Sequence, residues 1–312
     1  MVLPVGRLDL LSIRLFVAVV EERSIVKAAS RENITTSAVS KRISDLEANL
    51  RTDLLLRHRQ GVEVTPAGHA LLLHCRAILA RIDQIFADMS EFGEGMRGLI
   101  RLAANESAAI GYLPGDINRF LALAPFVKVD MQVATSPTVI RMVLDNASDI
   151  GIFTGQEPTG DLRVVHYRSD RLVAVCPASL TFDCEDGAVG FERILDHPNI
   201  GSEASGAIET LMQRAAGRLG RKLDTRVRVS SFDAAARLVE AGVGISIMTE
   251  AVARPLARAL DIGIVRLAEP WAQRELRICL RKGGEQTPLL QRFLEVLQDA
   301  PPPLDGAPVP RV

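Results

Sequence analysis

The sequence predicts a mixed α/β protein of 312 residues, with a helix-turn-helix unit, a long helix and a larger α/β domain in that order. Three observations support this. Two short amphipathic segments flank a polar turn between residues 24 and 47, apolar residues then repeat in steps of four and three, and strand and helix patterns alternate from residue 99 onward. A hydrophobic content of 47% supplies enough apolar surface for two or three folded domains.

The first element expected is an amphipathic helix over residues 9–22. Apolar residues recur along it at helical spacing: Leu11, Leu15, Phe16 and Val19. Ser24 can cap a short second helix, in which Ala28 and Ala29 permit the close approach of another helix. The polar residues 32–34 then turn the chain.

The third helix begins after Thr35, whose hydroxyl can cap it. Its apolar residues form one stripe, made of Val39, Ile43, Leu46 and Leu50. Residues 54–64 follow as two short strands around Gln60-Gly61, where glycine adopts a positive φ at little cost. Three helices and a hairpin in this order predict a winged helix-turn-helix.

The longest predicted helix covers about residues 66–89. Thr65 is a capping residue and Pro66 suits the first helical position, where its missing N–H costs nothing. The apolar residues of this helix recur in coiled-coil steps: Leu71, Cys75, Ile78, Ile82, Ile85 and Met89. We expect a dimerisation arm ending in a hinge, and the alternative is a helix that packs on its own domain.

The remaining chain alternates strands and helices, which predicts parallel sheets covered on both faces. The strands are expected at 99–104, 127–133, 149–153, 172–176, 226–230, 244–248 and 276–280. The helices are expected at 112–123, 137–146, 207–217, 233–241, 250–260 and 289–297. The proline-rich residues 301–312 are expected to be a disordered tail.

Basic residues concentrate in the helix-turn-helix although the net charge of the whole chain is only -1. Residues 24–62 contain seven basic side chains and four acidic ones, so any DNA contact must be local. Hydroxyls at the start of the third helix can bond to phosphates or base edges, and Lys41 could reach guanine. The side chains expected to contact DNA are Arg31, Thr35, Thr36, Ser37, Ser40, Lys41, Arg57 and Arg59. The alternative for each alone is a solvated surface position.

These residues resemble those of LysR-type transcriptional regulators. The resemblance includes residues 16–21, 24–29, 38–47, 54–57 and 61–68. In weaker form it extends over nearly the whole chain. It implies a C-terminal effector domain built like a periplasmic binding protein, with two lobes around a cleft.

Three positions depart from the family pattern. Thr36-Ser37 stands where the family usually has Gln-Pro, Arg51 stands in place of a glycine, and Glu32 in place of a leucine. The first difference predicts another half-site preference, because these side chains lie at the usual base contact. The other two are expected to alter only local packing and charge.

The family resemblance implies that an effector binds between the lobes, at hydroxyls and backbone N–H groups. The corresponding residues here are Ser107, Thr135, Ser136, Ser202 and Ser205. Strand-to-helix loops suit this role, because helix N-termini favour anions. Thr154 and Phe232 are further candidates for the cleft wall. The alternative is that these hydroxyl residues simply cap helices.

The same resemblance sets the expected domain boundaries. A DNA-binding domain is expected at 1–66, a linker helix with its hinge at 67–98, and an effector domain at 99–300. Lobe I would comprise about residues 99–167 and 268–300, and lobe II about residues 168–267.

Other chemistry finds little support in the sequence. The five histidines lack ligand spacing and the four cysteines form no CxxC, so we expect no metal, no cofactor and no disulfide framework. Cys176 and Cys184 leave a redox switch open as a minor alternative. There is no P-loop and no Ser-His-Asp signature, and no apolar run is long enough to span a membrane. We therefore expect a cytoplasmic protein that is not an enzyme.

The function predicted is that of a transcriptional regulator whose effector changes operator binding or DNA bending. Its expected partners are double-stranded operator DNA and a small-molecule effector. The family resemblance implies a homotetramer, formed as a dimer of dimers, and RNA polymerase is a further candidate partner. Two rival hypotheses are a solute-binding protein that shares the two-lobed domain and an enzyme of α/β fold.

Overall fold

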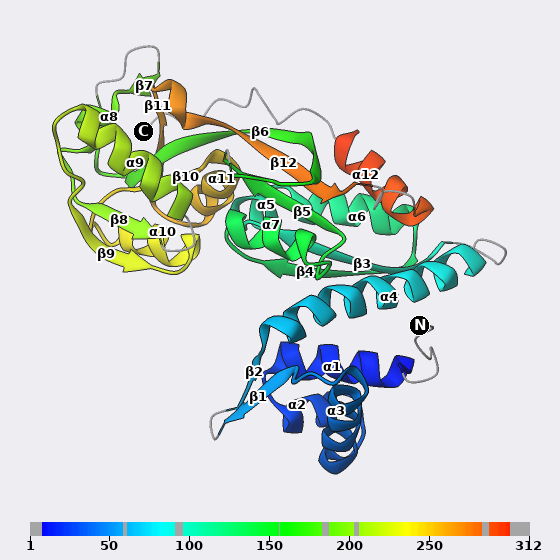
Figure 1. The fold of residues 1–312 in the computed structure, drawn as a ribbon. Coiled ribbons are helices and arrows are strands. Elements are labelled where there is room, and N and C mark those ends of the chain that lie inside the picture. Colours follow the sequence, from blue (N-terminus) through cyan, green and yellow to red (C-terminus); the bar gives the residue numbers. More distant parts are fainter. Residues whose placement is uncertain are drawn as a thin grey trace. The chain divides into compact units, whose positions relative to one another are not determined.

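The structure is a computed structural model that describes residues 8–58, 61–90, 96–155, 157–182, 187–202, 206–282 and 287–299 (Figure 1). The chain divides into two compact units, residues 1–92 and 93–312, which are described separately below. In the described residues, no helix is both long and apolar enough to cross a membrane. The predicted tail at 301–312 lies outside the described residues.

The N-terminal unit is a winged helix-turn-helix followed by a long helix, as predicted. Its elements are α1 (Leu10–Glu22), α2 (Ile25–Arg31), α3 (Thr36–Leu50), β1 (Leu55–His58), β2 (Gly61–Val64) and α4 (Pro66–Ser90). The two strands pair antiparallel, with His58 opposite Gly61. Gly61 has φ 137°, and a Cβ there would lie 2.8 Å from the Arg23 carbonyl oxygen, so only glycine fits this position beside the turn of the wing.

Three predicted caps set the helix starts. The Ser24 hydroxyl accepts a hydrogen bond from the Lys27 N–H at 3.3 Å, and Thr35 accepts one from the Ala38 N–H at 3.3 Å. At the third cap, Thr65 Oγ1 accepts from the Gly68 N–H at 3.0 Å. Each hydroxyl satisfies a backbone donor that has no partner within its helix.

The core of this unit confirms most of the α3 stripe and corrects one residue of it. Val39, Ile43 and Leu46 are buried against α1, whereas Leu50 is 40% exposed and lies outside the core. The reason is that α3 ends at Leu50, one turn beyond Leu46, the last residue of the helix in the core.

Helix α4 packs on its own domain along its first half. Cys75 is buried, and Leu71 and Ile78 pack against the core that α1 and α3 form. The first half of the predicted coiled-coil seam therefore packs within its own domain, as in the alternative considered for this helix. Farther along, Ile85 is 58% exposed, and the side chain of Met89 lies outside the described residues.

The described residues of the C-terminal unit form two lobes, each with one large hydrophobic core. The elements of the first are β3 (Arg97–Ala104), α5 (Glu106–Gly111), α6 (Leu113–Leu123), β4 (Phe126–Val133), α7 (Ser136–Leu144), β5 (Ile150–Thr154), β6 (Leu162–Pro177), β12 (Gln273–Arg281) and α12 (Pro288–Gln298). The elements of the second are β7 (Ala188–Val189), α8 (Phe191–Ile194), β8 (Asn199–Ser202), α9 (Gly206–Arg218), β9 (Thr225–Val229), α10 (Phe232–Glu240), β10 (Ser246–Thr249), α11 (Glu250–Ala259), β11 (Ile262–Leu267) and η3 (Pro270–Ala272). A smaller hydrophobic cluster packs helix α7 on the other face of the first lobe's sheet.

The prediction of parallel sheets is wrong in part. Strand β3 pairs parallel with β4 and β5, but β12 pairs antiparallel with β5 and β6, and β10 and β11 pair antiparallel with β6. Strand β6 is the reason. It has 16 residues and begins ten residues before the predicted strand, in a stretch whose charged side chains hide the strand pattern.

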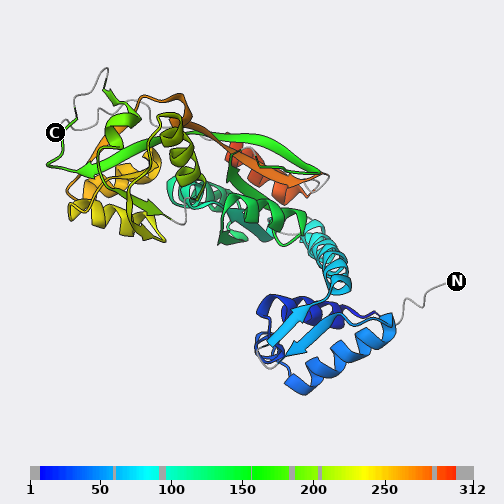
Figure 2. The same ribbon diagram turned by 60° about the vertical axis from the view of Figure 1, so that its left-hand side comes forward.

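Strand β6 runs through both lobes of the C-terminal unit, and β12 pairs with its first ten residues, Leu162 to Arg171 (Figure 2). The first core takes Tyr167 from β6 and Leu276 from β12, and the second core takes Leu172 from β6 and Ala272 just before β12. This antiparallel pair is therefore a ribbon that joins the two lobes, and the cavity described next lies beside it.

Candidate DNA-binding helix and interlobe cavity

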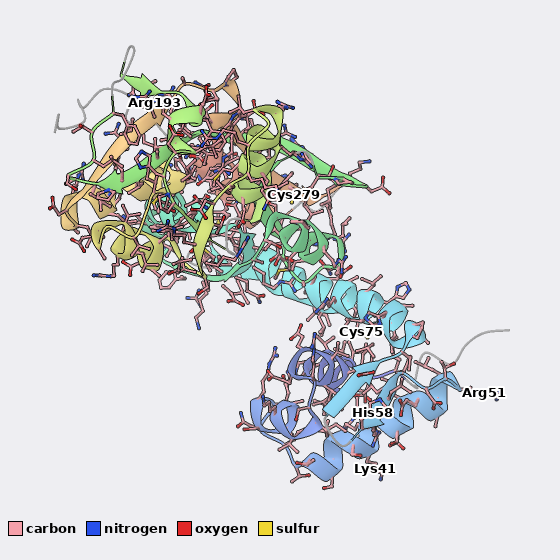
Figure 3. The ribbon with its side chains drawn as sticks, turned by 90° about the vertical axis from the view of Figure 1, so that its left-hand side faces the viewer. Lys41, Arg51, His58, Cys75, Arg193 and Cys279 are labelled. Atoms are coloured by element: carbon pink, nitrogen blue, oxygen red, sulfur yellow. The ribbon has the colours of Figure 1, made fainter. Side chains whose placement is uncertain are left out.

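Helix α3 exposes a polar face opposite its buried stripe. Thr36, Ser37 and Lys41 are exposed on this face, and Ser40 is half-buried. Lys41 points away from the domain (Figure 3), and within the described part of the chain no hydrogen bond or ion pair engages it. The Thr35 and Ser37 hydroxyls lie 3.2 Å apart at the start of the helix. This face offers several uncommitted donors to a polyanion.

Arg57, one of the side chains expected to contact DNA, lies on the wing strand β1 and is directed at α3. Its guanidinium donates to the hydroxyl of Ser40 at 2.9 Å and to that of Ser44 at 3.1 Å, and it lies 3.8 Å from Glu47. The side chain therefore lies along α3, because two hydroxyls and a carboxylate of that helix solvate its charge. Its neighbour Arg59 lies outside the described residues.

Arg31 ends α2 beside two acidic side chains of α1. Its Nη1 atom donates to Glu21 at 2.9 Å and to Glu22 at 3.4 Å. Partial burial lowers the pKa of Arg31, but the bonds to the two carboxylates outweigh burial and raise it. The side chain remains 46% exposed, so one side of its guanidinium can still face a phosphate.

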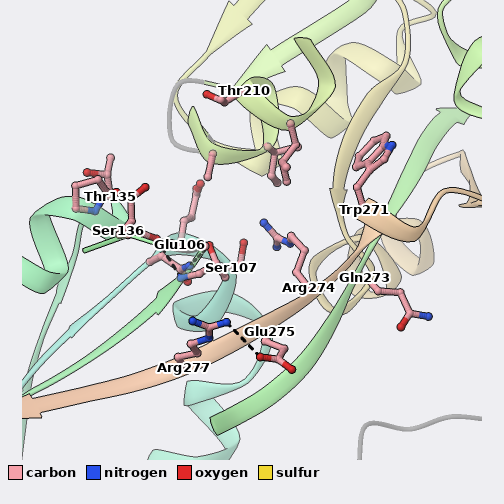
Figure 4. Close-up of a pocket in the computed structure, with 18 of the residues that line it drawn as sticks. Glu106, Ser107, Thr135, Ser136, Thr210, Trp271, Gln273, Arg274, Glu275 and Arg277 are labelled. Atoms are coloured by element: carbon pink, nitrogen blue, oxygen red, sulfur yellow. Dashed lines mark hydrogen bonds and ion pairs between the residues drawn. The ribbon is translucent and has the colours of Figure 1, made fainter. Parts of the chain in front are cut away.

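A cavity of about 1110 Å³ lies between the lobes of the C-terminal unit (Figure 4). The first lobe contributes the residues that follow β3, β4 and β5. Ser107, Thr135, Ser136 and Thr154 all line it, as the sequence predicts for residues at strand ends.

These hydroxyls are not simple helix caps. Asn105 caps α5 by accepting from the Ala108 N–H at 2.9 Å, so Ser107 lies inside the helix. Thr135 precedes α7, but its Oγ1 atom bonds to Thr138 Oγ1 at 3.0 Å and makes no cap bond. The Ser136 hydroxyl accepts from the backbone N–H of Thr154 at 3.1 Å, which fixes it at the cavity wall.

Other predicted cleft residues have different outcomes. Phe232 is only 1% exposed and packs in the core of the second lobe, so its assignment to the cleft wall is wrong. Ser231 caps α10, which turns the next side chain inward. Ser205 lies outside the described residues, and Ser202 is described only through its backbone in β8.

The cavity also has a charged wall that the sequence did not reveal. It comes from the end of η3 and the start of β12, and its members are Trp271, Gln273, Arg274, Glu275 and Arg277. Helix α9 faces it with Ala207, Ile208, Thr210, Leu211 and Arg214. The helical spacing of the α9 residues was visible in the sequence. The opposite wall could not be predicted, because residues 273–275 have no apolar pattern.

Arg274 forms a buried ion pair at the ribbon between the lobes. Its Nη2 atom lies 2.5 Å from Asp170, which is directly opposite in the β12–β6 register. Tyr112 donates to the same carboxyl group at 3.2 Å. Burial raises the pKa of Asp170, and the guanidinium of Arg274 offsets part of this rise.

Glu106 connects the two lobes. Burial raises the pKa of its carboxyl group, and a hydrogen bond from the backbone N–H of Phe232 offsets part of the rise. Glu106 begins α5 in the first lobe, whereas Phe232 begins α10 in the second. The other carboxyl oxygen, Oε2, is buried and has no partner among the described residues.

A β-bulge stabilises the ribbon at its base. Tyr167 is the extra residue of β6 opposite β12, and the bulge lets Tyr167 and Arg168 both reach Asp116. The Tyr167 hydroxyl donates to the Asp116 carboxyl group at 2.6 Å, and Arg168 donates to it at 2.9 Å. Arg168 also bonds to the Leu297 carbonyl at 2.9 Å, which fixes the ribbon to α12.

The chain is similar to known transcriptional regulators over most of its length. The HTH-type regulator YbhD of Escherichia coli, described as uncharacterized, is 28% identical over 93% of this chain and 90% of its own length. AlsR of Bacillus subtilis, an HTH-type transcriptional regulator, is 25% identical over 93% of this chain and 95% of its own length.

Solved structures show the same fold. CbnR, a LysR family transcriptional regulator, superposes with a TM-score of 0.67 at 20% identity and covers 93% of this chain and 98% of its own. A structure of full-length CbnR in complex with its target DNA gives a TM-score of 0.66 at 21% identity, covering 93% of this chain and 99% of that chain.

Family models match both units of the chain. One described as "Bacterial regulatory helix-turn-helix protein, lysR family" matches residues 10–69, and one described as "LysR substrate binding domain" matches residues 93–302. The second match alone covers more than half of the sequence, so the chain belongs to the LysR family of transcriptional regulators.

Proposed function

We propose that this regulator contacts its operator mainly through the exposed face of α3 and responds to a small molecule bound in the interlobe cavity. The uncommitted Lys41 on that face is the observation that carries the DNA part of the proposal. The DNA contacts are assigned to Thr35, Thr36, Ser37, Ser40 and Lys41, with Arg31 and Arg59 on phosphates. Arg57 supports the helix by holding Ser40 and Ser44.

The cavity supports the effector part of the proposal. Ser107, Thr135 and Ser136 present polar groups into it from one lobe, α9 closes it from the other, and β6 and β12 connect the two. A compound that prefers one degree of closure shifts the population toward that state. The change reaches DNA as an altered spacing or bend of half-sites. Ser202 and Ser205 remain candidates on the second lobe.

The assembly proposed is a homodimer through α4 that pairs into a homotetramer. Ile85, exposed on the second half of α4, supports the dimer because a large apolar side chain gains from burial. Effector-dependent binding of promoter DNA needs no catalysis, so we propose a regulator without enzymatic activity that acts in the cytoplasm.

A gel shift with the DNA upstream of the chain's own gene tests the DNA part. We expect a sequence-selective shift that weakens steeply with salt, because phosphate contacts release counterions. A thermal-shift screen of metabolites tests the effector part, because a ligand at 100 times its dissociation constant adds roughly 2.7 kcal/mol of stability. Ser136→Ala should blunt that response and leave the gel shift unchanged. A protein that shifts no DNA selectively would contradict the proposal.

A further inference from the structure

Three arginines line the interlobe cavity. Arg274 and Arg277 come from β12, and Arg214 comes from α9 on the opposite lobe. Figure 4 shows Arg274 directed into the cavity between the two lobes. Cationic groups on both walls of one cavity can bind a single anion between them.

Arg274 has unused donors although it is almost fully buried. Its side chain is 9% exposed, and its only hydrogen bond among the described residues is made by Nη2 to Asp170. The Nε atom is buried without a partner. A guanidinium has five N–H donors, and native structures rarely leave buried donors unpaired. An acceptor group of a bound molecule would pair with the remaining N–H donors of Arg274.

Three glutamates line the cavity together with the three arginines: Glu106, Glu157 and Glu275. Among the described residues, none of them forms a hydrogen bond or ion pair with Arg214 or Arg274. Glu275 is 3.5 Å from Arg277 and partners it. The carboxyl group of Glu106 is directed at the Phe232 N–H. Arg214 is exposed and forms no ion pair with any described residue. The uncommitted donors therefore belong to Arg214 and Arg274.

Apolar side chains also line the cavity near these two arginines. Ile208 and Leu211 line it from α9 together with Arg214, and Trp271 lines the opposite wall, which also carries Arg274. Such a surface accommodates a hydrocarbon body beside a charged head group. Arginine recognises a carboxylate through two parallel N–H donors.

We propose that the effector is a small organic carboxylate whose carboxylate group binds to Arg274 and Arg214, with its hydrocarbon part against Trp271 and Leu211. This inference rests on the proposed function, because it takes the cavity as the effector site. An anion that binds to both lobes stabilises the state in which the lobes are closed. The negative charge of the effector is thereby coupled to lobe closure.

The sequence supplies a direct probe, because Trp271 is the only tryptophan of the chain. We would titrate the full-length protein, at constant ionic strength, with butanoate, glutarate and 3-phenylpropanoate while recording tryptophan fluorescence. The uncharged amide and the ammonium counterpart of each compound serve as controls. The expected result is a saturable change with at least one carboxylate and none with its amide or ammonium counterpart.

Two variants and a matched control locate the carboxylate. Arg214→Gln should raise the apparent dissociation constant roughly tenfold or more, the usual effect of losing a charged hydrogen bond. Arg274→Lys keeps the charge beside Asp170 but removes the planar pair of parallel N–H donors, and should also weaken binding. Arg218→Gln, one turn farther along α9 and outside the cavity lining, should bind like the wild type.

The opposite results overturn the proposal. These are no saturable change with any carboxylate, equal responses to the amides, or equal loss in Arg218→Gln and Arg214→Gln. A gel shift on the same preparations separates this inference from the proposed function. Intact DNA binding without a carboxylate response refutes the carboxylate alone, whereas a carboxylate response without DNA binding refutes the regulator assignment alone.

Discussion

Lys41 is the side chain whose loss should most affect operator recognition, because it is exposed on α3 and has no partner in the described structure. We expect Lys41→Ala to weaken specific DNA binding by about 1–3 kcal/mol, the range for a bidentate contact to a base. A quantitative gel shift measures this, and sedimentation should show an unchanged oligomer. Lys128→Ala removes an exposed lysine from the other unit and is the control. Wild-type affinity in Lys41→Ala would show that another face of the domain binds DNA.

Glu106 predicts a pH dependence of stability with a definite sign. Burial raises the pKa of this carboxyl group from its ordinary value of 4.5, so the fold favours the protonated form. The favourable contribution is complete below pH 4.5 and is lost as the pH rises through the raised pKa.

The variant Glu106→Gln keeps an acceptor for the Phe232 N–H and cannot ionise. We therefore expect the variant to become increasingly more stable than the wild type as the pH rises from 4 to neutrality, with a constant difference beyond the raised pKa. Denaturant unfolding of both proteins at a series of pH values tests this, since other carboxyl groups cancel in the comparison. A difference that does not vary with pH would contradict the assignment.

Single residues show where prediction of the site succeeded. Ser107, Thr135 and Ser136 follow strand ends, and the carboxyl ends of neighbouring strands meet at one edge, so the cavity receives all three. Arg274 was not predictable, because its role depends on its register opposite Asp170, which is distant in sequence. Phe232 was misplaced because a residue after a capping serine can face either the cleft or the core.

At the scale of elements, the start of α4 packs too tightly for any side chain at Gly68. A Cβ atom there would lie 2.2 Å from the Leu54 carbonyl oxygen. We expect Gly68→Ala to lower the free energy of unfolding of the N-terminal unit by about 1–3 kcal/mol, as other overpacked sites do. Circular dichroism during thermal unfolding measures the change.

The matched control is Gly115→Ala in α6, where nothing lies within 4 Å of the added Cβ. That substitution should stabilise the protein by up to about 1 kcal/mol, because alanine loses less backbone entropy in a helix than glycine. If both variants destabilised equally, the backbone contact at Gly68 would not be the cause.

Helix α4 offers a test of the proposed dimer. We expect Ile85→Glu to raise the dimer dissociation constant at least tenfold, because burying an isoleucine contributes roughly 1.5–3 kcal/mol. Ile85 is 58% exposed, so the charge should not disturb folding. Leu73→Glu alters another face of the helix at a residue that is 43% exposed, and should leave the dimer intact. Analytical ultracentrifugation measures the dimer dissociation constant of both variants. Weakened dimerisation in Leu73→Glu but not in Ile85→Glu would show that the interface lies on the face of Leu73.

Elements with capping residues and apolar periodicity were predictable from sequence, since both signals are local. The first half of β6 was not. Arg163, His166 and Asp170 interrupt its pattern, and only pairing with β12 makes the segment a strand. Antiparallel pairing of residues more than 100 positions apart has no local signature, which explains the wrong expectation of parallel sheets.

At the scale of the whole molecule, the two-stranded ribbon restricts how the effector domain can move. Asp116, Tyr167 and Arg168 fix the ribbon on the side of the first lobe, so we expect a change of closure to move the second lobe relative to this anchored end. A compound that protects the fold in a thermal-shift assay should therefore change the DNA bend angle. Circularly permuted operator fragments measure this angle, and an unchanged angle with unchanged affinity would contradict coupling between cavity and operator.

The path of the ribbon has one further consequence. Every buried residue of the second core lies in one continuous stretch from Leu172 to Ala272, whereas the first core draws residues from both sides of that stretch. The second lobe is thus one continuous insertion between β6 and β12 of the first lobe. Arg171 and Gln273 are direct cross-strand partners, so a two-residue Asn-Gly turn could replace everything between them. The first lobe without this insertion would keep its own core and give a minimal scaffold for engineering new sensors.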